Sequence, residues 1–201
     1  MAKEGSTRLD RDVLMVGVGG QGALLASKIM GAAAIASGLD VKVSEVHGMA
    51  RRGGGVVTYV RMSGGKVRSP IVERGGADCV IAFEKLEALR WAGHLKDGGL
   101  MVMGTQEIYP MPVVTGAERY PDDIVGMLSG GRFRLVAVDA LAIAESCGDM
   151  RAVNTVLLGV YAKASGIAED IWLEAVKSNA PARSASVNLD AFGRGWRMAG
   201  E

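Results

Sequence analysis

Cysteine is scarce in this sequence: Cys79 and Cys147 are the only two among 201 residues. Neither belongs to a C-x-x-C pair, whereas cysteine-ligated iron–sulfur clusters and zinc knuckles take their ligands from closely spaced cysteines. A Gly-Asp pair at 148–149 opens like a thiamine diphosphate motif, but Met150 follows it and no Asn-Asn pair comes at the required distance. We therefore expect this chain to hold no metal, no iron–sulfur cluster and no thiamine diphosphate by itself.

An excess of charge of either sign is also lacking, because 23 Lys and Arg nearly balance 22 Asp and Glu and leave a net charge of +1. That balance does not suggest a basic surface of the kind that binds nucleic acid. No apolar run approaches the roughly 20 residues that span a bilayer, and residues 1–12 are too polar for a secretory signal. We therefore expect a cytoplasmic protein with neither a nucleic-acid nor a membrane partner.

Aromatic residues make up only 5% of the chain, whereas glycine occurs 29 times and hydrophobic residues reach 49%. This balance is typical of a globular protein in which turns and close packing of small residues are prominent. The length suits one sizeable hydrophobic core, and a second full domain would be cramped. We therefore expect a single domain over 1–201.

Short apolar runs, the first of which ends in glycines at 17–22, alternate with stretches that read as helices, such as 23–37, which is rich in Ala, Leu and Ile. This alternation predicts buried strands joined by helices. We expect strands at 12–17, 39–46, 77–83, 98–104 and 134–140, and helices at 23–37, 84–95 and 120–128. The remainder is mainly helical, with helices expected at 140–147, 151–164, 168–178 and 187–198.

Residues 56–62 and 66–72 flank Ser63-Gly64-Gly65, a short glycine-containing connection typical of a β-hairpin. A hairpin at this point departs from a plain alternation of strands and helices. The predicted fold class is therefore α/β: a Rossmann-like open, mostly parallel sheet with flanking helices, an inserted β-hairpin and a helical C-terminal part.

A glycine-rich segment, GVGGQG at 17–22, joins the first predicted strand to the first predicted helix. Glycines there allow a tight turn, and the free N–H groups that open the helix favour a phosphate. Glu45, which ends the second predicted strand, could bind a ribose as the acidic residue of a dinucleotide site does. The same glycines would equally serve close packing or contact with a partner, so both interpretations stay open. The candidate residues in this loop are Gly17, Gly19, Gly20, Gln21 and Gly22, and the Gln21 amide can both donate and accept hydrogen bonds.

A second loop, SEVHGMARRGGG at 44–55, leaves the carboxyl end of the second predicted strand. Loops at that edge of an open α/β sheet gather around ligands, so we expect the two loops to face each other. Cationic side chains and flexible glycines suit an anionic cofactor or the loop of a partner protein. The candidate residues in this loop are His47, Met49, Arg51, Arg52, Gly53 and Gly54.

Four further polar residues have simpler predicted roles. We expect Asn154, within an apolar helix, to satisfy a buried backbone group or to contact another subunit. Glu84 and Glu87 are three residues apart, and such carboxylate pairs usually face solvent. His94 is expected at a helix end.

Five segments belong together: GVGGQG at 17–22, EVHGMARRGG at 45–54, SP at 69–70 before GGADCVIAFEKLEALR at 75–90, VNTVLLG at 153–159 and NLDAFGRG at 188–195. In combination they resemble the gamma-type domain of 2-oxoacid:ferredoxin oxidoreductases, and most closely the indolepyruvate branch of that family. The resemblance runs from about Val13 to Gly195, nearly the whole chain.

The resemblance implies a hetero-oligomer in which a larger alpha subunit holds thiamine diphosphate and 4Fe-4S clusters. That complex would convert an aryl 2-oxoacid such as indolepyruvate to acyl-CoA and CO2, with coenzyme A as co-substrate and ferredoxin as electron acceptor. This chain would be inactive alone, would supply no catalytic acid or base, and would help to complete the active site.

Two alternatives come from the residues themselves. A free-standing NAD(P)-binding reductase would explain the glycine spacing and Glu45, but the chain lacks room for a substrate domain. A nucleotide-binding regulatory module would need only the first loop. Tight binding of NAD(H) by the isolated chain would favour these alternatives over the subunit.

Overall fold

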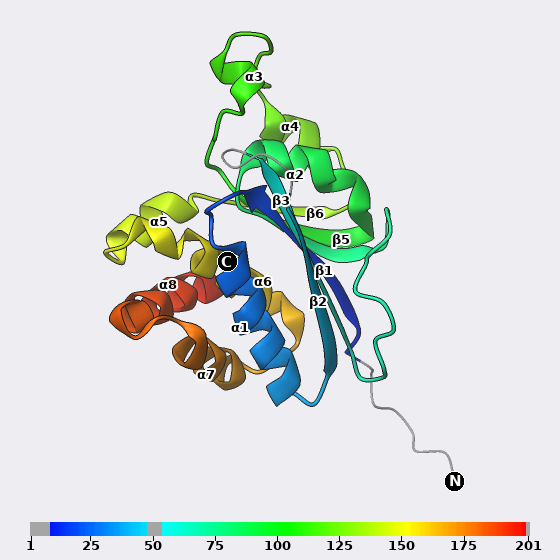
Figure 1. Ribbon diagram of the computed structural model, residues 1–201, viewed down its shortest axis with the longest axis vertical. Coiled ribbons are helices and arrows are strands. Elements are labelled where there is room, and N and C mark those ends of the chain that lie inside the picture. Colours follow the sequence, from blue (N-terminus) through cyan, green and yellow to red (C-terminus); the bar gives the residue numbers. More distant parts are fainter. Residues whose placement is uncertain (1–8, 48–53, 200–201) are drawn as a thin grey trace.

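The fold is a six-stranded sheet between two layers of helices, and the computed structural model describes residues 9–47 and 54–199 (Figure 1). The strands are β1 Arg11–Val18, β2 Asp40–His47, β3 Gly55–Ser63, β4 Ala77–Ala82, β5 Leu95–Gly104 and β6 Arg134–Val138. The helices are α1 Ala23–Ala36, α2 Lys85–Trp91, α3 Met111–Val114, α4 Ile124–Ser129, α5 Ala140–Ser146, α6 Val153–Ser165, α7 Glu169–Asn179 and α8 Ala185–Met198. Short 3-10 turns cover Ala92–His94, Met150–Ala152 and Ala182–Ser184.

The sheet has the strand order β2-β3-β1-β4-β5-β6. Strands β1, β4, β5 and β6 run parallel, whereas β3 is antiparallel to both of its neighbours, β1 and β2. The predicted fold class, an open and mostly parallel α/β sheet with a helical C-terminal part, is confirmed. Among the described residues no helix combines the length and apolar character needed to cross a membrane.

The predicted partner of β3 was wrong, because residues 66–72 form no strand. Strand β3 is already paired along both edges, with β2 and with β1, so no edge remains for a third strand. The segment is held instead at the end of the sheet, where Val67 N donates to Asp40 Oδ2 at 2.7 Å. Val67 and Val72 are buried there.

The sheet divides the core into two layers, as the side chains of β1 illustrate. Alternate side chains of this strand point to opposite faces of the sheet. Val13 and Met15 pack with buried residues of α1 and of helices α5 to α8. Leu14 and Val16 pack in a separate cluster with α2 and α4 on the other face. Figure 1 shows the same separation, with α1 and the C-terminal helices on one side of the sheet and α2 and α4 on the other.

Two glycines from different motifs bring α6 and α8 into close contact. A Cβ on Gly159 would overlap the carbonyl oxygen of Phe192 and lie 2.9 Å from Trp196 N. A Cβ on Gly195 would overlap the carbonyl oxygen of Val156. The last glycines of VNTVLLG and NLDAFGRG therefore allow the two helix backbones to touch.

Element boundaries differ from the predictions where a capping side chain or a turn intervenes. Helix α4 begins at Ile124 rather than 120, because Asp123 Oδ1 accepts from Gly126 N at 2.8 Å and caps the helix. The helix predicted over 84–95 ends at Trp91 and continues as a 3-10 turn. Helix α3, which has only four residues, was not predicted.

Candidate functional site

A cleft of about 270 Å³ lies beside the first glycine loop, at the carboxyl end of β1. It is lined by the loop itself, the start of α1, and side chains from three strands or their ends: Gly17, Val18, Gly19, Gly20, Gln21, Gly22, Ala23, Leu24, Glu45, Val56 and Phe83. Carboxyl ends of parallel strands are where open α/β sheets bind ligands. Of the sequence candidates, the structure brings the five loop residues and Glu45 to this one cleft.

The amide of Gln21 holds the glycine loop in shape. Its Oε1 accepts from Val18 N at 2.7 Å, and its Nε2 donates to Phe83 O at 3.0 Å. A Cβ on Gly17 would lie 2.7 Å from Gln21 Oε1, so only glycine leaves room for this arrangement. The Gln21 amide therefore uses one donor and one acceptor in hydrogen bonds within the protein, and through them it positions the loop.

The first turn of α1 opens toward this cleft without a cap. Gly22, with a φ of 85°, is the N-cap residue; no side chain caps the helix and no acidic residue occupies its first turn. Within residues 9–47 and 54–199, no hydrogen bond uses the N–H groups of Ala23 or Leu24. Uncapped N–H groups and the helix dipole favour an anion at this position.

A buried polar chain supports the loop from behind. Asn154 Nδ2 donates to Gly22 O at 2.9 Å, and Asn154 Oδ1 accepts from Thr155 N at 2.9 Å. Thr155 Oγ1 in turn bonds Asn188 Oδ1 at 2.6 Å. The first of the two predicted roles of Asn154 is therefore confirmed: it satisfies buried backbone groups, and it ties the glycine loop to α6 and α8.

We expect Asn154→Ala to lower the free energy of unfolding by about 1–3 kcal/mol, because Asn154 is 1% exposed and Thr155 N would lose its acceptor. Asn179→Ala is the matched control, since Asn179 Nδ2 also bonds a backbone carbonyl but on a partly exposed helix end. Urea unfolding of both variants measures the difference. Equal losses for the two variants would contradict the role given to Asn154.

The end of the second glycine loop meets the first. Gly19 N donates to Gly54 O at 3.2 Å, and the backbone of His47 pairs with that of Val56 at the end of β2. Both ends of the second loop therefore lie beside the cleft. Met49, Arg51, Arg52 and Gly53 lie outside the described residues, as does the side chain of His47.

A second cleft, of about 280 Å³, lies on the other side of Gly20 and Gln21. Its remaining walls come from the segment after β5 and from the start of the C-terminal helices: Gln106, Ile108, Leu141, Met150, Arg151 and Val153. Sequence reasoning did not identify these residues. Their position in the sequence could have pointed to them, because the segment that follows a parallel strand emerges at the same edge of the sheet as the glycine loop.

Glu84 and Glu87 are buried, so the predicted exposure of this pair was wrong. Glu84 Oε2 accepts from Glu87 N at 2.9 Å and caps α2. Its Oε1 accepts from Ile108 N at 3.2 Å and from the hydroxyl of Tyr120. Burial, together with the hydrogen bond to Glu84 and the charge of that carboxylate, raises the pKa of Tyr120. Glu84 therefore fastens the segment after β5 to the body of the protein.

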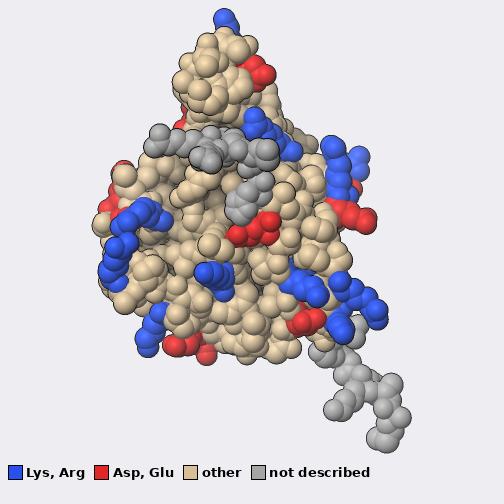
Figure 2. Space-filling model, in the orientation of Figure 1, with Lys and Arg blue, Asp and Glu red and all other residues tan. Residues whose placement is uncertain are grey.

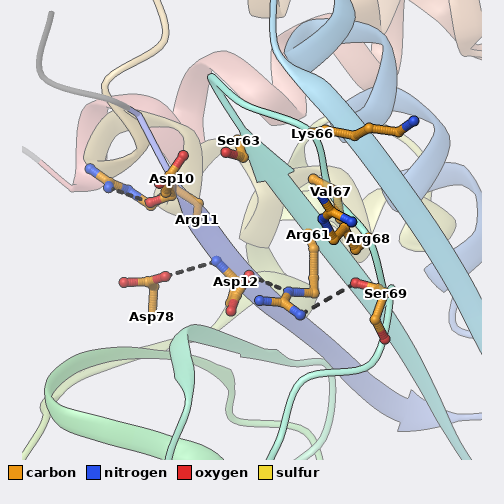
Figure 3. Close-up of a pocket in the computed structure, with 10 residues that line it drawn as sticks. All are labelled: Asp10, Arg11, Asp12, Arg61, Ser63, Lys66, Val67, Arg68, Ser69 and Asp78. Atoms are coloured by element: carbon orange, nitrogen blue, oxygen red, sulfur yellow. Dashed lines mark hydrogen bonds and ion pairs between the residues drawn. The ribbon is translucent and has the colours of Figure 1, made fainter.

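A charged cleft of about 330 Å³ lies at the opposite end of the sheet (Figure 3). Arg61 donates to Asp12 Oδ1 at 2.7 Å and to the carbonyl oxygens of Ser69 and Ile71. Asp78 accepts from Asp12 N and pairs with Lys96. These groups hold residues 66–72 in place, and we assign this cleft a structural role.

His94 lies at the end of a 3-10 turn, in agreement with its predicted place at a helix end. Its ring packs against that of Trp91 at an angle of 40°, with centroids 4.5 Å apart. Burial lowers the pKa of the imidazole, and the charge of Arg74 lowers it further. The neutral imidazole is therefore favoured in the folded state.

Protonation of His94 should cost stability as the pH falls. The pKa is lowered on folding, so the contribution of His94 is fully present above about pH 6.5, the value for an unfolded chain, and is lost as the pH drops toward the lowered pKa. His94→Phe can retain the ring contact with Trp91 but cannot be protonated. Between about pH 7.5 and about pH 5 we therefore expect its free energy of unfolding to fall less than that of the natural chain. Urea unfolding at the two pH values tests this, and parallel losses would contradict it.

Among the described residues, no group of three or more His, Cys, Asp or Glu side chains is arranged so that it could hold a metal ion. Cys79 is buried, and burial raises the pKa of its thiol, which is the reverse of what a metal-binding thiolate needs. The residues present therefore do not fit an iron–sulfur cluster.

The sequence is similar to curated proteins over almost its full length. It is 40% identical to the indolepyruvate oxidoreductase subunit IorB of Archaeoglobus fulgidus, over 94% of each chain. It is 36% identical to the subunit of the same name from Thermococcus kodakarensis, over 94% of this chain and 96% of the relative. A ketoisovalerate oxidoreductase subunit VorA of Methanothermobacter thermautotrophicus is 30% identical over 82% of this chain, which spans only 31% of that longer relative.

The fold is also similar to solved structures. A keto/oxoacid ferredoxin oxidoreductase gamma subunit from Geobacter sulfurreducens aligns with a TM-score of 0.71 at 24% identity, over 94% of this chain and 98% of that one. A 2-oxoglutarate:ferredoxin oxidoreductase from Magnetococcus marinus aligns with a TM-score of 0.72 at 23% identity, over 95% of this chain and 31% of that chain. The family model for pyruvate ferredoxin/flavodoxin oxidoreductase matches residues 12–198. The chain therefore belongs to the pyruvate ferredoxin/flavodoxin oxidoreductase family, as a gamma-type subunit of a 2-oxoacid:ferredoxin oxidoreductase.

Proposed function

We propose that this chain is the small subunit of a cytoplasmic indolepyruvate-type 2-oxoacid:ferredoxin oxidoreductase, and that its glycine-loop edge completes an active site shared with a larger partner subunit. The names of two relatives that match nearly the whole chain, both indolepyruvate oxidoreductase subunits, support the choice of an aryl 2-oxoacid. The complex would release CO2 from the 2-oxoacid, pass two electrons to ferredoxin and leave the acyl group on coenzyme A.

The larger alpha subunit would hold thiamine diphosphate and the 4Fe-4S clusters. The described part of this chain has no cluster of metal-binding side chains, and the sequence has only two cysteines. Electrons would therefore reach ferredoxin through the partner. This chain contributes a surface to the active site and supplies no catalytic acid or base.

The observation that carries this proposal is the uncapped start of α1 beside the cleft. No described residue accepts a hydrogen bond from the N–H groups of Ala23 and Leu24 there. Both ends of the loop that contains Arg51 and Arg52 lie beside the same cleft. Together these groups suit a phosphate or carboxylate, such as those of coenzyme A, thiamine diphosphate or a 2-oxoacid. The Magnetococcus marinus structure contains bound 2-oxoglutarate, coenzyme A and succinyl-CoA. Gln21 and His47 would orient the contact.

Glu45 favours one alternative, a dinucleotide site, because it lines the same cleft as the glycine loop. The strand order argues against that alternative. In a dinucleotide-binding half the strand that carries the acidic residue lies next to β1, whereas here the antiparallel β3 separates β2 from β1.

Anaerobic affinity purification of the tagged chain from its source cells separates the two functions. The proposal expects a larger partner with a brown iron–sulfur spectrum and bound thiamine diphosphate, identified by mass spectrometry and by absorbance. A colourless lone protein that binds NAD(H) tightly would overturn the proposal and favour the reductase.

A further inference from the structure

Three large apolar side chains gather on a part of the chain that the site does not use. Tyr109, Met111 and Val114 are 54%, 61% and 62% exposed and lie within six residues of one another. We call these three side chains the α3 tip. Figure 1 shows α3 standing away from the sheet, and Figure 2 shows this protrusion as mostly uncharged surface. Grouped apolar side chains on an otherwise polar surface mark contact sites, whereas single ones do not.

The α3 tip stands on a base that is fixed in place. Ile108 N and the Tyr120 hydroxyl both donate to the buried Glu84 carboxylate, one before and one after the tip in sequence. Lys85 adds two contacts, with its N–H donating to Gln106 O at 3.1 Å and its ammonium pairing with Glu107 at 2.5 Å. The rings of Tyr109 and Tyr120 pack with centroids 5.1 Å apart.

A fixed base matters because a pre-organised surface loses less conformational entropy when it binds. Burial of the Glu84 carboxylate costs free energy unless its oxygens accept hydrogen bonds. Here the donors of those hydrogen bonds include groups of this segment, such as Ile108 N, which are thereby held in place. The protein thus combines a rigid support with apolar side chains that face solvent in the isolated chain. That combination is typical of a docking element rather than of a surface loop.

The α3 tip is continuous with the functional edge. Ile108, next to Tyr109 in sequence, lines the cleft on the far side of Gly20 and Gln21. Met150, on another wall of that cleft, is 59% exposed. A protein that covers the glycine loop from this side would therefore meet the α3 tip. The opposite end of the sheet is lined instead by charged groups such as Asp10, Arg11 and Lys66, which suit water.

We infer that the α3 tip inserts into an apolar pocket on the larger subunit of the oxidoreductase. This inference rests on the proposed function, which supplies that subunit. The longer relatives support this occupant, because the match to this chain spans only 31% of the Methanothermobacter subunit and 31% of the Magnetococcus chain. In those proteins the rest of the chain is available to cover the surfaces that this chain leaves open.

The test measures binding of this chain to the cluster-bearing partner, isolated as the proposed function describes. The variant combines Met111→Glu with Val114→Glu, both at exposed positions, so that thermal melting should match the natural chain. The control is Ile35→Glu, because Ile35 is 65% exposed and lies in the last turns of α1, away from the glycine loop. We expect the tip variant to raise the Kd at least about 10-fold and the control to stay within about 2-fold.

Other results would overturn the inference in distinguishable ways. A tip variant that folds normally and binds the partner within about 2-fold of the natural chain removes the α3 tip from the interface. Loss of self-association with partner binding intact would assign the tip to a second copy of this chain. If the natural chain itself binds no cluster-bearing partner, the proposed function fails, and the inference fails with it.

Discussion

Gly195→Ala should lower the free energy of unfolding by about 3 kcal/mol or more, a severe overpacking of the contact between α6 and α8. The added Cβ would overlap the carbonyl oxygen of Val156 and lie 2.9 Å from its carbonyl carbon and 3.2 Å from Val160 N. All three atoms belong to the backbone of α6, so no side-chain rotation relieves the overlap. The two helices must separate, and the apolar residues between them lose contact.

Gly193→Ala, two residues earlier on the same helix, is the matched control. A Cβ there would meet only Arg197 Nη1 at 3.4 Å, an ordinary contact with a flexible side chain. Because alanine favours helix over glycine, this change should raise stability by about 0.5–1 kcal/mol. Urea unfolding followed by circular dichroism measures both variants, and equal effects would contradict the close contact at Gly195.

Gly22→Ala is expected to remove most of the activity of the assembled oxidoreductase and to lower stability as well. Gly22 has a φ of 85°, where an L-residue costs about 1–2 kcal/mol, and its Cβ would lie 2.5 Å from Asn154 Nδ2. The change therefore distorts the start of α1, where the unused N–H groups face the cleft. Ferredoxin reduction by the complex and unfolding of the isolated chain should both be affected.

Gly19→Ala separates function from folding in the same loop. Gly19 has an ordinary φ, and a Cβ there would meet no atom of the described residues within 4 Å. Stability should therefore stay close to that of the natural chain. If the cleft receives a ligand or a partner backbone, the added methyl group should still raise the KM for coenzyme A or weaken assembly. Natural activity and assembly of Gly19→Ala would show that this part of the cleft is empty in the enzyme.

The strands of the parallel part of the sheet could be predicted because each contains a short apolar run, and those in β1 and β5 end at a glycine. The order of the strands in the sheet could not be predicted. Periodicity shows that β3 is a strand, but it does not show that β3 pairs with both β2 and β1. Residues 66–72 were mistaken for a strand because they follow β3 after a short glycine-containing connection of the kind that joins two strands of a hairpin. Helix α3 is too short for a helical period to be visible.

The candidate site was predictable at the level of loops but not of individual contacts. The sequence placed the glycine loop, Glu45 and the second loop at one edge, and the described residues of these segments do lie together. It did not reveal that Gln21 is committed to Val18 and Phe83. Nor did it predict that Glu84 is buried, because its partners Ile108 and Tyr120 lie 24 and 36 residues away.

The most direct test of the central claim is the initial rate of ferredoxin reduction by the purified cluster-bearing partner, measured without oxygen on indolepyruvate and coenzyme A. The natural chain is added at increasing concentrations. If this subunit completes a shared active site, the rate should be negligible without it, rise as it is added and level off at a fixed ratio of the two subunits, with coenzyme A required throughout. A full rate in its absence would contradict the claim.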